Sequence, residues 1–127
     1  MNFGAMGAVA MAIAIGLGAF GAHGLKAQLS PEALSWWEIG VRYQVWHALG
    51  LIALALMTDH GHTTWRRRSG IAFLIGILIF SGSLYTLALG GPRFLGAVTP
   101  IGGLSFIVGW ISFALAFITA ARSDPDG

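Results

Sequence analysis

Four long apolar stretches dominate this sequence and leave the chain few ways to fold. They are Phe3 to Ala22, Ile39 to Thr58, Ile71 to Leu89 and Ile101 to Ala121. A bilayer core about 30 Å thick is crossed by about 20 helical residues that rise about 1.5 Å each, so each stretch is long enough to span a membrane. Transmembrane β-strands would need segments of about ten residues with alternating polarity. The sequence therefore predicts an all-α fold, an integral membrane four-helix bundle that forms a single transmembrane domain over residues 1–127.

Composition agrees with a chain that is covered by lipid. Of the 127 residues, 56% are hydrophobic and only 9% are charged, which is too little ionisable surface for a water-soluble globule of this size. Seven Lys and Arg against five Asp and Glu form no basic patch with interleaved aromatics, so we expect no nucleic-acid partner. The chain has no cysteine, which excludes disulfides, thiolate catalysis and cysteine-ligated metals.

Cationic residues gather on the side of the membrane that should hold both termini and the loop between the second and third stretches. That side carries Arg66, Arg67, Arg68 and Arg122, and the other side carries Lys26 and Arg93. Because cytoplasmic loops are enriched in Lys and Arg, the first side is predicted to be cytoplasmic. We therefore predict an N-in/C-in orientation.

Proline, glycine and a capping serine mark several helix boundaries. Ser30-Pro31-Glu32 combines a capping hydroxyl with proline and an acid in the first helical turn, which predicts a short interfacial helix before the second transmembrane helix. Gly90-Gly91-Pro92 should end the third helix. Thr99-Pro100 should start the fourth, because proline at a first helical position costs no hydrogen bond.

Small residues recur every three or four positions along one face of the first and fourth stretches. In the first they are Gly7, Ala10, Ala14, Gly18 and Gly21, and in the fourth Gly102, Ser105, Gly109, Ser112, Ala116 and Ala120. Membrane helices approach each other closely along such seams. We predict that the first and fourth helices pack closely together. The seams are either purely architectural, or one of them forms a homo-oligomer contact.

The second stretch carries polar side chains that are costly inside a bilayer unless they are paired or hydrated. Glu38 and Arg42 lie four residues apart and can pair on the outer rim. Residues of three helices form one candidate polar patch, which consists of His23, Arg42, Tyr43, Gln44, His47, Ser81, Ser83 and Tyr85. The patch is either an interhelical hydrogen-bond network or the lining of a ligand pocket open to the outer face.

Motifs of catalysis and cofactor binding are missing from the sequence. It contains no G-x-S-x-G elbow, no P-loop and no H-E-x-x-H pattern, so we predict neither an enzyme nor a bound cofactor. His23 and His47 could suggest haem or a metal, and Asp59-His60-Gly61-His62 could form a weak metal grip, but no further ligand pattern supports either site. We predict no metal site.

Short motifs in all four stretches resemble those of a known family. They are Gly18-Ala19-Phe20-Gly21-Ala22-His23-Gly24, Tyr43-Gln44 with His47-Ala48, Phe80-Ser81-Gly82-Ser83-Leu84-Tyr85, and Thr99-Pro100-Ile101-Gly102-Gly103 with Gly109-Trp110. Over nearly its whole length the chain is similar to the small membrane proteins of domain-of-unknown-function family 423, to which the human transmembrane protein 256 is related. The resemblance implies a multi-pass protein of the bacterial inner membrane. It implies no settled activity, substrate or cofactor.

Two hypotheses about function follow. The first is a non-enzymatic accessory, assembly or envelope-organising component that acts through helix contacts, with membrane lipid and a homo-oligomer or larger membrane complex as its partners. The second is a binder or carrier of a lipid or quinone-like amphipathic molecule, with Arg42 holding an anionic headgroup near the interface. A channel or transporter is less favoured, because four helices leave little room for a pore and no inverted repeat is visible.

Overall fold

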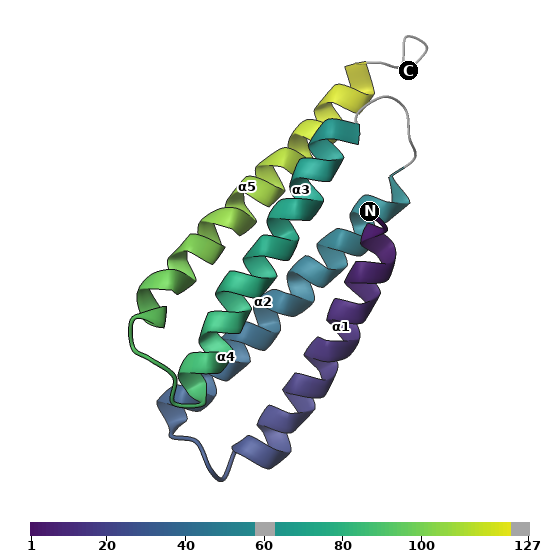
Figure 1. Ribbon diagram of the computed structural model, residues 1–127. Helices are drawn as coiled ribbons and strands as arrows, with labels where there is room; N and C mark the ends of the chain where they lie inside the picture. Colours follow the sequence, from purple (N-terminus) through teal and green to yellow (C-terminus); the bar gives the residue numbers. More distant parts are fainter. Residues whose placement is uncertain (58–62, 123–127) are drawn as a thin grey trace.

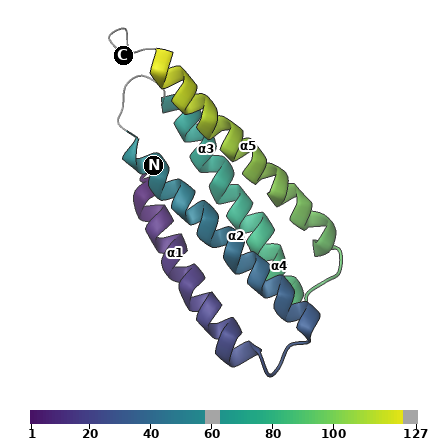
Figure 2. The same cartoon turned by 180° about the vertical axis from the view of Figure 1, so that it is seen from behind.

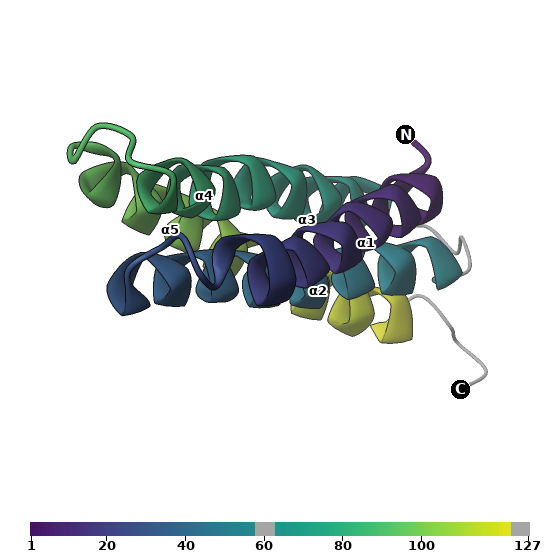
Figure 3. The same ribbon diagram turned by 90° about the horizontal axis from the view of Figure 1, so that it is seen from below.

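The computed structural model describes residues 1–57 and 63–122, and the secondary structure within them is entirely helical. The elements are α1 (Phe3–Phe20), η1 (Gly21–Leu25), α2 (Pro31–Leu56), α3 (Thr63–Gly76), η2 (Ile77–Ser81), α4 (Gly82–Ala88) and α5 (Leu95–Arg122) (Figure 1). The short elements η1 and η2 are π-helical turns. Since η1 extends α1, and α3, η2 and α4 run in one line (Figure 3), the described residues contain four helices long and apolar enough to cross a membrane. The predicted all-α fold with four membrane-length helices is confirmed.

Helix α2 begins where the sequence predicted a helix start, but it does not form a separate interfacial helix. The Ser30 hydroxyl accepts a hydrogen bond from the Ala33 N–H at 3.1 Å, and the helix then continues without a break for 26 residues. Gly40 does not interrupt the helix. Its lack of a side chain leaves room for the Tyr85 ring, since a Cβ at Gly40 would lie 2.7 Å from Cε1 of that ring. At about 1.5 Å per residue, α2 is longer than the bilayer core, so its ends reach the headgroup region.

The turn between α4 and α5 lies where it was predicted, but α5 starts earlier than expected. Gly90 has a φ of +90° and the Gly91 N–H donates to the Thr86 carbonyl at 2.8 Å, which ends α4. Helix α5 then begins at Leu95, so Pro100 lies inside it and not at its start. The missing proline N–H costs one hydrogen bond near the helix end, a position where carbonyls and N–H groups often find other partners.

The predicted packing of the first helix against the fourth is wrong. Helix α1 packs along α2, and α5 packs along α3; Figures 1 and 2 show α1 and α5 at opposite edges of the bundle. Both small-residue seams are nevertheless close-packing surfaces. A Cβ at Gly7 would lie 2.7 Å from the Ala48 carbonyl oxygen of α2, and a Cβ at Gly102 would lie 2.8 Å from Cα of Phe80 in η2. The seam of α1 therefore faces α2, the next helix in the chain, and the seam of α5 faces η2 of the membrane-spanning helix before it.

An aromatic and aliphatic core joins α2, α3 and α5, and α1 reaches it at one end. Its buried members are Phe3, Leu51, Leu54, Phe73, Phe106 and Phe113. Many large apolar side chains point outward, with Leu56 77% and Leu78 74% exposed, which is the pattern expected of a surface covered by lipid. The start of α1 and the end of α5 lie at the same end of the bundle (Figure 1). That this end is cytoplasmic stays a prediction from the arginine distribution.

Candidate functional site

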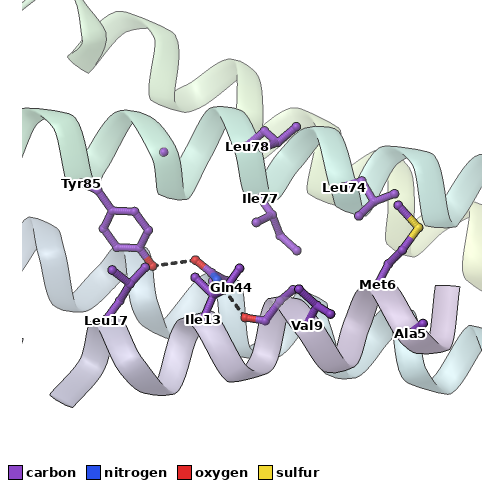
Figure 4. A pocket seen from close by; sticks show the side chains of 12 residues that line it. Ala5, Met6, Val9, Ile13, Leu17, Gln44, Leu74, Ile77, Leu78 and Tyr85 are labelled. Carbon is purple, nitrogen blue, oxygen red and sulfur yellow. Dashed lines mark hydrogen bonds between the residues drawn. The ribbon is translucent and has the colours of Figure 1, made fainter. Parts of the chain in front are cut away.

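A buried glutamine joins three helices at the centre of the bundle. Gln44 of α2 is 4% exposed. Its Nε2 donates to the Ala10 carbonyl of α1 at 2.9 Å, and its Oε1 accepts a hydrogen bond from the Tyr85 hydroxyl of α4 at 2.8 Å (Figure 4). Unsatisfied amide groups are costly in an apolar medium, so these two bonds stabilise the position of α1 against the remaining helices.

His47 lies one turn further along α2 and faces α5. Its Nδ1 lies 2.6 Å from the Tyr43 carbonyl oxygen, and its Nε2 accepts a hydrogen bond from Nε1 of Trp110 at 3.0 Å. A carbonyl can only accept, so Nδ1 carries the proton and the ring is neutral. The ring also stacks on Phe106 with 3.4 Å between centroids. Both ring nitrogens are thus occupied by the protein itself, which leaves neither for a metal or a ligand.

Two serines of the third membrane-spanning helix bind the neighbouring helices. The Ser81 hydroxyl, fully buried at the end of η2, donates to the Gly40 carbonyl of α2 at 2.7 Å. The Ser83 hydroxyl lies 2.6 Å from that of Thr99 in α5. Gln44, His47, Tyr85 and these two serines all make side-chain hydrogen bonds between helices, and together they are called the buried network. The choice between a structural network and the lining of a ligand pocket stays a prediction.

The remaining members of the predicted patch lie elsewhere. His23 and Arg42 are exposed. Arg42 and Glu38 line a hollow of about 250 Å³ between η1 and α2, although no ion pair joins them in the described part of the chain. The Tyr43 ring packs on Phe80 with 4.4 Å between centroids. The structure therefore divides the patch into a buried network and a separate exposed group, and a ligand-binding role for either stays a prediction.

An apolar groove runs between α1 and the helix formed by α3, η2 and α4. Its volume is about 700 Å³, and it is lined by Ala5, Met6, Val9, Ala10, Ile13, Leu17, Gln44, Leu74, Ile77, Leu78, Gly82 and Tyr85 (Figure 4). Along α1 it extends from Ala5 to Leu17, which is about 18 Å at the helical rise. Gln44 and Tyr85 are its polar members, and they bind each other at one end of the groove.

Sequence reasoning missed this groove and several hydrogen-bond partners. Its lining residues on α1, such as Met6, Val9 and Ile13, are of the same types as those on any lipid-facing helix surface. In the sequence, only the lack of a side chain at Gly82 indicates space between helices. Trp110 and Thr99 were not recognised as partners of His47 and Ser83, because a periodicity argument does not say which helices are neighbours.

The last feature to consider is a metal site. The described residues contain no cluster of three or more His, Cys, Asp or Glu side chains that could hold an ion. The weak metal grip considered for Asp59 to His62 lies outside residues 1–57 and 63–122.

Removing the Tyr85 hydroxyl should weaken the network without emptying space. We expect Tyr85→Phe to lower the free energy of unfolding by about 1 kcal/mol, because Gln44 Oε1 loses its donor inside an apolar medium. The ring contacts of Tyr85 with Trp37 and Gly40 remain. Tyr43→Phe is the matched control, since the Tyr43 hydroxyl makes no hydrogen bond within the described residues. Unfolding in mixed detergent micelles with increasing dodecyl sulfate measures both variants, and equal losses would contradict the assigned network.

The four membrane-length helices, their lipid-facing apolar surface and their buried polar network define a small polytopic membrane protein. Residues 17–103 match the model of a family described as a protein of unknown function, DUF423. The chain belongs to this family, as its motifs suggested. The match includes every polar member of the groove and of the network except Trp110.

Bacterial relatives extend the match to nearly the whole chain. A UPF0382 membrane protein of Staphylococcus epidermidis is 45% identical over 91% of this chain and 94% of its own length. The UPF0382 membrane protein YwdK of Bacillus subtilis is 42% identical over 89% and 93%. The UPF0382 inner membrane protein YgdD of Escherichia coli is 39% identical over 87% and 82%. No solved structure matches the chain. The relatives and the four helices place it among multi-pass proteins of the bacterial inner membrane.

Proposed function

We propose that this protein is a non-enzymatic membrane component that holds one hydrocarbon chain of a membrane amphiphile in the groove between α1 and α3–η2–α4. The observation that carries the proposal is the groove itself, about 700 Å³ in volume and lined almost wholly by apolar side chains. Ligand pockets in proteins commonly measure about 300 to 1,000 Å³. The groove is therefore large enough for a ligand and not a packing defect.

Water is a poor occupant of such a space. A buried water needs two to four polar partners, and apolar cavities stay dry. Gln44 and Tyr85 are the polar residues of the lining, and their Oε1 and hydroxyl groups already bind each other at 2.8 Å. Because an empty groove of this size would forfeit dispersion contacts along both walls, hydrocarbon is the favoured occupant.

Shape favours an extended chain over a partner helix. The groove is about 18 Å long by the rise of α1. A helix is about 10 Å across with its side chains, whereas a single hydrocarbon chain is much narrower and can lie between the two walls. A linear acyl or prenyl chain fits both the length and the volume. The quinone-like amphiphiles considered from the sequence remain within this class, but Arg42 lies outside the groove and has no part in the proposal.

Filling the groove from Gly82 tests the proposal. A Cβ at Gly82 meets no atom within 4 Å, so Gly82→Leu should fold normally while its side chain occupies groove space. We expect native mass spectrometry from mild detergent to show several-fold less retained lipid than in the wild type. Gly16→Leu is the matched control, because a Cβ at Gly16 also meets no atom within 4 Å and Gly16 does not line the groove. Equal lipid retention in the two variants would overturn the proposal.

The accessory or assembly role stays a prediction with less support than the sequence suggested. It rested on the small size of the chain, its short loops and the small-residue seams, which were expected to contact another chain. Gly7 and Gly102, however, are covered by Ala48 and Phe80 of the same chain. Co-purification of a stoichiometric membrane partner after crosslinking would restore that role.

A further inference from the structure

A second hollow lies at the end of the bundle opposite the start of α1 and the end of α5. Its volume is about 600 Å³. It is formed by the first turns of α2, one face of α4, the α4–α5 connection and the start of α5, and its lining includes Glu32, Trp36, Leu84, Leu87, Arg93 and Thr99. Leu84 and Leu87 belong to α4, as does Tyr85 of the groove, but they project from another face, so the two spaces do not share a lining residue.

Opposite charges face this hollow without neutralising each other. Glu32 and Arg93 both line it, and no ion pair joins them in the described ranges 1–57 and 63–122. The backbone of each residue is fixed by local structure. Glu32 lies in the first turn of α2 behind the Ser30 cap, and Arg93 lies in a turn closed by the Leu95 N–H, which donates to the Pro92 carbonyl at 3.1 Å. The hollow thus presents a carboxylate and a guanidinium as separate binding groups.

Apolar side chains form the wall of the hollow that extends toward the membrane. Leu84 is 7% exposed, and Leu87 and Trp36 are half-buried. Tryptophan is enriched at the level of lipid headgroups, where one side of its ring meets hydrocarbon and the other meets water. A ligand that fits both parts has a charged head and an apolar body.

We propose that this hollow binds a phospholipid with a zwitterionic headgroup, whose phosphate lies at Arg93, whose ammonium lies at Glu32 and whose glycerol and upper acyl chain pack on Trp36 and the two leucines. Guanidinium and phosphate form strong charge-assisted hydrogen bonds. A carboxylate favours a primary ammonium for the same reason. An anionic lipid would bring its phosphate to Arg93 but leave Glu32 unpaired beside negative charge, so the pair of side chains selects against it. This site is independent of the proposed groove.

Selectivity between two lipids tests this assignment. The full chain is placed in nanodiscs that contain equal amounts of phosphatidylethanolamine and phosphatidylglycerol with identical acyl chains, and the retained lipids are identified by native mass spectrometry. We expect the wild type to retain phosphatidylethanolamine preferentially. Glu32→Gln should shift the ratio toward phosphatidylglycerol roughly fivefold, which is the effect expected of one charge near a bilayer surface. Arg93→Gln should reduce retention of both lipids.

Neutralisations elsewhere at the same end of the bundle are the matched controls. Glu38→Gln and Arg42→Gln change the same charges, but these residues line the smaller hollow beside η1, so the lipid ratio should equal that of the wild type. Gly82→Leu removes only lipid held in the groove, so it should not shift the ratio toward phosphatidylglycerol, which separates this site from the groove. An unchanged ratio in Glu32→Gln, or an equal shift in Glu38→Gln, would overturn the proposal. Displacement of the lipid by soluble glycerophosphoethanolamine would assign the hollow to a free headgroup and would likewise overturn it.

Discussion

Replacing Gly102 by alanine is expected to lower the free energy of unfolding by about 2 kcal/mol, although only one methyl group is added. A Cβ at this position would lie 2.8 Å from both Cα and Cβ of Phe80 and would also press on the Phe80 backbone nitrogen. Backbone atoms cannot rotate aside as a flexible side chain can. Either α5 moves away from η2, with loss of the Phe106 packing on Gly76, or the π-helical turn changes its shape. Unfolding by dodecyl sulfate in mixed micelles measures the loss.

The neighbouring glycine is the matched control for Gly102. A Cβ at Gly103 would lie no closer than 3.8 Å to the Phe80 ring, which is ordinary van der Waals contact. Alanine is also the better helix former, by about 1 kcal/mol in a helix interior. Gly103→Ala should therefore be neutral or slightly stabilising. If both variants lost the same stability, the close approach of α5 to η2 would be refuted.

His47→Ala is expected to lower the free energy of unfolding by about 3 kcal/mol. The side chain is 3% exposed, so its removal leaves a cavity between α2 and α5. Phe106 loses the ring stacked on it, and the Trp110 N–H loses its acceptor. Both losses occur where water cannot replace the missing group.

Two further variants separate the components of that loss. Trp110→Phe removes the donor but keeps an aromatic ring, and it should cost about 1 kcal/mol, the value of one hydrogen bond. Leu49→Ala truncates a residue of the same helix that is 52% exposed to lipid, and its effect should be small because lipid fills the space. An equal loss in Leu49→Ala and His47→Ala would show that His47 does not face the interior.

The sequence predicted the membrane spans well because the bilayer imposes a local requirement. Each helix must cover about 30 Å of hydrocarbon with its own apolar residues, whatever its neighbours are. Local chemistry also located the Ser30 cap and the glycine turn at Gly90. It located the start of α5 less well, since Pro100 is as compatible with a second helical turn as with a first.

The candidate site was predicted only in part. The high cost of polar groups in lipid correctly drew attention to Gln44, His47 and Tyr85, because such groups must find partners inside the protein. Their partners could not be read from the chain. A backbone carbonyl such as that of Ala10 is present in every residue. Trp110 resembles any lipid-facing tryptophan until the fold brings its N–H to His47 of α2.

By itself, therefore, the sequence determined that this protein crosses the membrane four times as α-helices and which of its side chains need partners there. The tertiary structure alone decided which helices are neighbours, and through them the groove along α1 and the charged hollow at Glu32 and Arg93. The physical reason is that two seams of small residues are equivalent in periodicity and differ only in what packs against them. That choice depends on the shapes of Phe80, Ala48 and their neighbours in three dimensions, which no single helix contains.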